Sequence, residues 1–275
     1  MNLNDIKSIR NTHESTGKMP VLFVGHGSPM NAIEENEFSA GWRMAGETLP
    51  KPSMILCVSA HWETDGTFVT AVPKPKTIHD FYGFPKQLFA VQYPAPGNPQ
   101  MAKEISDEIK STEVGLDEKW GLDHGAWSVI KHMYPNADVP VVQFSLDRRK
   151  DLDFHFELAK ELSFLRTKGV LIVGSGNMVH NLSVIAWNKM NESEYGYEWA
   201  CEADYKFKKV VNSGDFKSLV DYQNLGREVG LAVPTPEHFI PLIYTLSLKE
   251  ESDNLSWFND KLVLGSISMS SLMIG

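Results

Sequence analysis

The sequence predicts an α/β fold in which a single domain has a mostly parallel central sheet flanked by helices on both faces. Three observations support this prediction. Short apolar runs recur along the chain, helical patterns separate them, and no linker or shift in composition divides the 275 residues. Strands that alternate with helices form a mostly parallel sheet that is covered on both faces, and α/β domains often reach this length. We therefore expect one domain over residues 1–275, with residues 1–18 as a polar N-terminal extension.

The predicted strands are six apolar runs. Most of them are continuous rather than alternating, which is typical of strands that are buried on both faces. In chain order they span residues 20–24, 54–58, 67–72, 139–144, 170–173 and 261–269.

The predicted helices lie between these strands, at residues 98–111, 125–133, 151–168, 194–211 and 236–248. Asn98 with Pro99, and Thr235 with Pro236, each place a residue suited to capping before a proline, which is favoured in the first helical turn. Gly169 is a helix stop ahead of the strand that begins at residue 170.

The composition excludes several classes of function. Asp and Glu outnumber Lys and Arg by 35 to 26, and the net charge of −9 argues against binding to nucleic acid or to an anionic membrane surface. No apolar run reaches the roughly 18–20 residues of a membrane span, and the N-terminus lacks the apolar segment of a signal peptide. The two cysteines, Cys57 and Cys201, do not suggest a disulfide framework. We expect a soluble cytoplasmic protein, and the sequence leaves its oligomeric state open.

The segment from residue 73 to residue 99 has an unusual composition for a loop. It contains six prolines and a group of aromatic residues at 78–85. Proline lowers the entropy that a loop loses on folding, and a long ordered loop in a compact domain is usually functional. We expect this loop either to line a binding site or to pack its aromatic side chains over an edge of the sheet.

Three of the nine histidines follow predicted strands. His26, His61 and His180 come two, three and seven residues after the ends of three apolar runs. In open α/β sheets, ligands bind at the carboxyl ends of the strands. A single histidine in such a place is more often structural, but three at equivalent positions favour a shared site.

Two further histidines are candidates because they lie near predicted helix starts. His124 follows Asp123, a residue suited to capping, and His238 lies in the first turn of the helix predicted over 236–248. Each alone is more often a solvated helix-end residue, although neutral imidazole is the commonest metal ligand. We assign no function to the remaining helical and N-terminal histidines, which are His13, His132 and His155.

A mononuclear metal site is the simplest chemistry for this group of histidines. A Ser-His-Asp triad needs a Gly-x-Ser-x-Gly turn, and the frame around Ser175 does not match it. A phosphate-binding loop needs a lysine after its glycines, and none follows. A metal with open positions can act as a Lewis acid or, if it is iron, bind dioxygen together with a chelating substrate.

Six stretches of the sequence resemble the LigB-type class III extradiol ring-cleavage dioxygenases, in particular their 4,5-DOPA-dioxygenase-like branch. The stretches together extend over most of the chain, and they are Gly25–Pro29, Ser59–Trp62, His79–Pro85, Leu122–Trp127, Gly174–Asn181 and Pro234–Leu242. The resemblance implies cleavage of a catechol ring, DOPA-like or caffeate-like, with insertion of both atoms of O₂. It also implies one divalent metal ion per chain, either Zn²⁺ or Fe(II).

The resemblance implies roles for the five candidate histidines by position. His26, His61 and His238 correspond to metal ligands. His180 corresponds to the catalytic acid or base and is a candidate for an additional ligand, and His124 corresponds to a residue that hydrogen-bonds substrate or oxygen.

The resemblance also implies contacts to the substrate ring from Trp62, His79, Tyr82 and Phe84. One feature departs from the wider superfamily, whose usual metal set is two histidines and one carboxylate. An all-histidine set carries no ligand charge, which makes zinc occupancy easier.

Two other classes of function stay open from the residues alone. The first is a zinc-dependent hydrolase in which Glu63 or Glu237 acts as the general base. The second is a non-enzymatic protein that handles a metal or a tetrapyrrole, because a strand followed by His-Gly-Ser also occurs in chelatases. The aromatic loop at 73–99 favours a small planar substrate over either of them.

Overall fold

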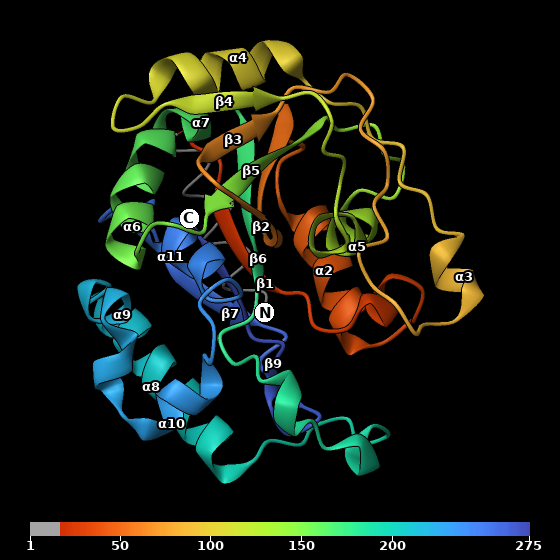
Figure 1. The fold of residues 1–275 in the computed structure, drawn as a ribbon, viewed down its shortest axis with the longest axis vertical. Helices are drawn as coiled ribbons and strands as arrows, with labels where there is room; N and C mark the ends of the chain where they lie inside the picture. The colour runs from red at the N-terminus through yellow and green to blue at the C-terminus, as the bar shows by residue number, and fades with distance from the viewer. Residues whose placement is uncertain (1–16) are drawn as a thin grey trace.

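A sheet of eight strands forms the centre of residues 17–275, the part of the chain that the computed structural model describes (Figure 1). The strand order is β4-β3-β5-β2-β6-β1-β10-β7. The four central strands are parallel to one another, and they are β1 (Val21–Gly25), β2 (Met54–Thr64), β5 (Val141–Asp147) and β6 (Val170–Gly176). Residues 1–16 of the predicted N-terminal extension lie outside the described residues.

The outer strands make the sheet mixed at both edges. β3 (Thr67–Thr70) is antiparallel to β5 and parallel to β4 (Val114–Asp117). At the other edge β10 (Ser271–Ile274) is antiparallel to both β1 and β7 (Leu255–Phe258). The predicted fold class, an α/β domain with a mostly parallel central sheet, is therefore confirmed.

Helices cover both faces of this sheet, as predicted (Figure 1). On one face, α2 (Glu37–Thr48) and α5 (His124–Met133) pack together, and on the other α6 (Leu152–Lys160) packs against α11 (Ile240–Ser247). The continuous apolar runs supply both cores, because successive strand side chains point to opposite faces. Val21 and Phe23 of β1 thus belong to one buried cluster, and Leu22 and Val24 belong to the other.

The remaining elements surround this framework. They are the helices α3 (Lys86–Phe89), α4 (Pro99–Glu108), α7 (Phe164–Thr167), α8 (Glu198–Ser213), α9 (Lys217–Val220) and α10 (Arg227–Ala232), and the 3₁₀ turns Pro29–Ala32, Glu161–Ser163, Leu182–Val184, Trp187–Lys189 and Tyr222–Leu225. No helix within residues 17–275 combines the length and the apolar character that a membrane crossing requires.

The strand predicted over residues 261–269 is wrong. The segment forms a small hairpin outside the main sheet, with β8 (Leu262–Val263) antiparallel to β9 (Ile267–Ser268). Between them Leu264 has φ 54° and Gly265 has φ 83°. Left-handed backbone reverses the chain, so an apolar run that looks continuous in sequence is folded back on itself.

Two predicted helices also differ from the structure. The helix expected from residue 236 begins at Ile240, so its first-turn proline is Pro241 rather than Pro236, and His238 lies in the preceding turn. The helix expected over 151–168 is interrupted by a 3₁₀ turn, Glu161–Ser163. By contrast, the predicted helix stop at Gly169 is confirmed by its φ of 73°.

Candidate metal centre

Five histidines converge at the carboxyl ends of the central parallel strands. His26 directly follows β1, His61 lies near the carboxyl end of β2, and His180 comes four residues after β6. These three strands are neighbours in the order β2-β6-β1, so side chains far apart in sequence meet at one edge of the sheet. The first residue of α5, His124, and the turn before α11, which carries His238, complete the cluster.

The ring centroids show how closely the five side chains pack. The His26 ring lies 5.0 Å from His61, 5.4 Å from His238 and 5.6 Å from His124. His61 lies 5.0 Å from His238 and 3.9 Å from His124. His180 stacks on His238 with 3.5 Å between centroids and an angle of 12° between planes.

Gly176, the last residue of β6, brings the turn with His238 close to the sheet. The amide of Asn177 donates a hydrogen bond of 2.8 Å to the carbonyl oxygen of His238. A Cβ atom on Gly176 would lie 2.2 Å from that oxygen, which is closer than any real contact. Only glycine therefore permits this approach of backbone to backbone.

A buried polar network supports the start of α5 below the cluster. Asp123 accepts hydrogen bonds from the Ala126 amide at 3.1 Å, from the Ser59 hydroxyl at 2.6 Å and from the Gln143 side chain at 2.6 Å. Asp123 is therefore the helix cap that the sequence predicts. Burial raises the pKa of Asp123, and the charge of Asp80 raises it further. The network fixes where α5 begins and hence where His124 lies.

Hydrogen bonds determine the tautomer of His26. The Ser175 hydroxyl donates to the carbonyl oxygen of Gly125 at 2.6 Å, so its single proton is used there. The Nδ1 atom of His26 lies 3.0 Å from the same hydroxyl oxygen and must donate to it. The lone pair of His26 is therefore on Nε2, which faces Nε2 of His61 at 3.2 Å.

Carboxylates accept hydrogen bonds from Nδ1 of His124 and His238 in the same way, and one of them also lies near Nδ1 of His61. The carboxylate of Asp80 lies 3.0 Å from Nδ1 of His124 and 3.5 Å from Nδ1 of His61, and Glu237 lies 3.1 Å from Nδ1 of His238. A paired Nδ1–H leaves Nε2 as the free lone pair, the arrangement found in metal-ligating histidines. The two ring nitrogens of His180 have no hydrogen bond within residues 17–275.

Four of the five imidazoles in the cluster, those of His26, His61, His180 and His238, are neutral at neutral pH. Burial lowers the pKa of His61 to about 3 and that of His180 to about 4. Burial and the neighbouring histidines lower the pKa values of His26 and His238 well below the ordinary value. Neutral imidazole is the form that binds a metal, because protonation removes the lone pair.

The donor set fits a divalent metal. The distances between ligand nitrogens and the distances between ring centroids each indicate which histidines would share it. Ligand nitrogens of His26, His61 and His124 lie within 4.8 Å of one another, and a second such group consists of His180, Glu237 and His238. With metal–nitrogen bonds of about 2.1 Å, imidazoles at tetrahedral positions have centroids about 5 Å apart. The centroid distances among His26, His61 and His238 match this value, whereas His61 and His124 are closer.

The aromatic loop reaches the cluster through residues that differ in part from those predicted. Phe81 packs edge-on against His124, with 5.5 Å between centroids, and Phe84 packs on Phe81 at 5.4 Å. His79 packs against Phe81 rather than against the five clustered histidines, and its Nε2 is 2.9 Å from the carbonyl oxygen of Val91. The loop therefore presents an apolar wall to the histidines.

Trp62 and Tyr82 are not brought to the cluster. Trp62 follows His61 on a strand and so points to the opposite face, where it is buried and stacks on Trp120 at 5.7 Å. The Tyr82 side chain is 93% exposed at the tip of the loop. This conformation therefore places neither side chain against the five histidines, and their contacts to a substrate ring stay a prediction.

Asp80, Phe81 and Ser175 are site residues to which the sequence reasoning assigned no role. Asp80 and Phe81 lie in the stretch that also contains His79, and Ser175 lies between the two glycines at the end of β6. A signal for Asp80 was available, since a carboxylate beside a histidine in a candidate site is a common partner of ligating imidazole. The partner that each one contacts follows only from the tertiary structure.

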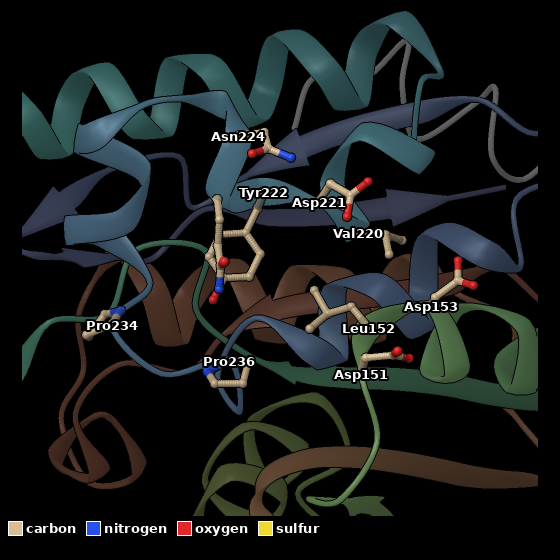
Figure 2. A pocket seen from close by; sticks show the side chains of 10 residues that line it. Asp151, Leu152, Asp153, Val220, Asp221, Tyr222, Asn224, Pro234 and Pro236 are labelled. Carbon is tan, nitrogen blue, oxygen red and sulfur yellow. The ribbon is translucent and has the colours of Figure 1, made fainter.

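A separate pocket of about 360 Å³ lies beside the segment that precedes His238 (Figure 2). Pro234 and Pro236 line it together with the start of α6 and the chain around Tyr222. Two of its three acidic side chains have structural partners, since Asp151 caps α6 and Asp153 pairs with Lys217. None of the five clustered histidines lines this pocket.

Comparison with known proteins identifies similar chains over almost the whole length. The family model described as the catalytic LigB subunit of aromatic ring-opening dioxygenase matches residues 20–272. The chain is 43% identical to a 4,5-DOPA dioxygenase extradiol of Escherichia coli strain K12, over 95% of this chain and 96% of that relative. It is 35% identical to a protein of the same name from Beta vulgaris, over 91% of this chain and 96% of that one.

Among solved structures, a crystal structure of an uncharacterized protein from Escherichia coli K12 is similar to this chain. The TM-score is 0.79 and the sequence identity is 38%. The match covers 94% of this chain and 100% of the other.

Proposed function

Because the chain belongs to the family of the catalytic LigB subunit of aromatic ring-opening dioxygenases, we propose that it opens the ring of a catechol with O₂, using one divalent metal ion. The observation that carries this proposal is the cluster of five imidazoles, in which hydrogen bonds occupy Nδ1 of His26, His124 and His238 and leave their Nε2 atoms free. The relatives named 4,5-DOPA dioxygenase extradiol support a DOPA-like substrate, and a caffeate-like phenol has the same catechol ring.

We propose His26, His61 and His238 as the ligands of this metal, which is either Fe(II) or Zn²⁺. Their ring-centroid spacings support this choice over a set that includes His124, whereas the spacing of ligand nitrogens groups His26 and His61 with His124. When bound, the metal supplies Lewis acidity that holds the catechol oxygens and lowers their proton affinity.

His180 is the group best suited to take a proton from the catechol. It is neutral at pH 7, and within residues 17–275 its ring nitrogens make no hydrogen bond that would compete. Its ring stacks on His238, so it lies beside the proposed ligands. His124 donates Nδ1–H to Asp80 and therefore offers Nε2 as an acceptor to a substrate hydroxyl.

The apolar wall of the site comes from the loop at 73–99. Phe81 and Phe84 give a planar ring a surface to pack against, and they exclude water from one side of the histidines. His79 supports Phe81 from behind, with 5.8 Å between ring centroids. Contacts of Tyr82 with a substrate require this exposed side chain to fold inward, and they stay a prediction.

Oxygen uptake tests the proposed function. Protein loaded anaerobically with Fe(II) should consume O₂ when a catechol such as DOPA or caffeate is added, and the absorbance of a ring-opened product should rise in step. The same panel with single-hydroxyl phenols serves as the control, because such phenols cannot chelate a metal. Absence of catechol-dependent uptake from protein with bound metal would refute the proposal.

If the protein were instead the zinc-dependent hydrolase considered as an alternative, its activity would not require O₂. An enzyme that uses Glu63 or Glu237 as general base should act on esters or amides with Zn²⁺ bound and should be indifferent to O₂. The tetrapyrrole-handling alternative predicts binding of a porphyrin. Family membership over residues 20–272 favours neither of them.

A further inference from the structure

Asp80 connects the aromatic loop to two histidines of the centre. One carboxylate oxygen accepts the backbone amide of His124 at 2.9 Å, and the other lies 3.0 Å from Nδ1 of His124 and 3.5 Å from Nδ1 of His61. The side chain is 19% exposed, so water competes little for these contacts.

We propose that Asp80 is a positioning residue, which holds His61 and His124 as Nδ1–H tautomers so that both present Nε2 to the metal and substrate. This inference rests on the proposed function, since it gives the two histidines their roles. An imidazole whose Nδ1–H is held by a carboxylate has a fixed ring orientation and a more basic Nε2. Without such an acceptor the proton can move to Nε2, which removes the lone pair that a metal requires.

The variant Asp80→Asn separates this role from a general packing role. An amide of the same shape has one acceptor oxygen and one NH₂ donor, whereas the carboxylate has two acceptors. If the oxygen keeps the His124 amide, the NH₂ group faces the Nδ1 atoms and forces their protons onto Nε2. If the amide is turned over, the NH₂ group opposes the His124 backbone N–H. Both orientations disturb the site while the volume of the side chain is preserved.

The experiment measures metal binding to the full chain without catechol or O₂. Apo protein is titrated with Zn²⁺ against a competing chelator and, separately, with Co²⁺, whose visible spectrum reports ligand geometry. Asp80→Asn should bind Zn²⁺ about 10- to 100-fold more weakly, the range seen when outer partners of ligating histidines are removed, and its Co²⁺ spectrum should change. Asp80→Glu keeps both acceptors and should recover part of the affinity.

Two controls keep the result interpretable. Asp138→Asn removes a carboxylate from an exposed pair with Lys51 and should leave metal affinity unchanged. The thermal unfolding of apo Asp80→Asn should stay near that of the parent protein, which separates a local effect from misfolding. Wild-type Zn²⁺ affinity and an unchanged Co²⁺ spectrum in Asp80→Asn would overturn the inference.

A double variant assigns the effect between the two histidines. If Asp80 acts through His61, Asp80→Asn should still weaken Zn²⁺ binding in the His124→Ala background. No further loss in that background would overturn the assignment to His61. Because neither substrate nor O₂ is present, Asp80-dependent metal binding without catechol turnover would refute the proposed function and leave this inference standing.

Discussion

At the scale of single residues, the candidate centre depends on which nitrogen of each imidazole carries a proton as much as on where the rings lie. The hydroxyl of Ser175 can donate only once, and its donation to Gly125 obliges His26 to donate from Nδ1. Carboxylates at Asp80 and Glu237 have the same effect on their histidines. The result is that Nε2 of His26, His124 and His238 is free to bind a cation, which requires an unprotonated ring nitrogen.

The roles of individual histidines lead to the first prediction at this scale. His26→Ala, His61→Ala and His238→Ala should each lose most bound metal, as measured by metal analysis after dialysis. His180→Ala should keep most of its metal while kcat falls by roughly 10²- to 10⁴-fold, the usual contribution of a general base.

The same set of variants tests whether His124 belongs to the ligands. His124→Ala should keep its metal and lose affinity for the catechol, because the ring spacing places His124 too close to His61 for both to be ligands at tetrahedral angles. Metal loss in His124→Ala with retention in His238→Ala would show that the nitrogen spacing identifies the ligands and that the ring spacing does not.

At the scale of elements, the ends of strands and the starts of helices position the site. The end of β6 approaches the turn before α11 so closely that a side chain on Gly176 has no room. The buried cap at Asp123 determines where α5 begins, and so which residue of that helix faces the centre. A change at such a junction should therefore affect metal binding without removing any ligand.

Gly176→Ala tests this coupling. The added Cβ would lie 2.2 Å from the carbonyl oxygen of His238, so the turn must move away. We expect a loss of about 1–3 kcal/mol in the free energy of unfolding, as for other overpacked positions, together with weaker Zn²⁺ binding.

The matched control is Gly230→Ala, at an exposed position of α10. No atom lies within 4 Å of a Cβ added there, and alanine favours helix over glycine by roughly 1 kcal/mol. This variant should be as stable as the parent protein or slightly more stable. Equal effects at the two glycines in urea unfolding would contradict the proposed close approach.

At the scale of the whole molecule, buried histidines should make the protein sensitive to acid. Burial lowers the pKa of His155 to about 4, that of His180 to about 4 and that of His61 to about 3. In the unfolded chain a histidine titrates near 6.5. Below that pH the unfolded state binds more protons than the folded state, so stability is full above pH 6.5 and falls as the pH drops toward 4.

Urea unfolding of the metal-free protein at pH 7 and pH 5 measures this effect. His155 is fully buried outside the centre, beside Tyr244, and a shift of this size contributes a loss of about 2 kcal/mol over that interval. His155→Gln should therefore lose about 2 kcal/mol less than the parent protein between the two pH values, whatever its stability at pH 7. Identical losses in the two proteins would refute the prediction.

The histidine pattern and the parallel centre of the sheet were predictable because both depend on short-range information. Continuous apolar runs mark strands buried on two faces, and residues that follow parallel strands share one edge. The hairpin at 262–268 and the start of α11 were not predictable in the same way. Left-handed backbone at Leu264 and a turn at Glu237–Phe239 look like strand and helix in a local reading of the sequence.

The sequence by itself therefore determined the fold class, the family resemblance and the identity of the five histidines at the sheet edge. Only the tertiary structure decided which nitrogen of His26, His124 and His238 is free, that Asp80 lies against two histidines, and that Trp62 faces away from the centre. The physical reason is the separation along the chain between the residues that determine each property. Periodicity and chain order are local properties, whereas a tautomer depends on an acceptor supplied by a segment that is distant along the chain, such as Ser175 for His26.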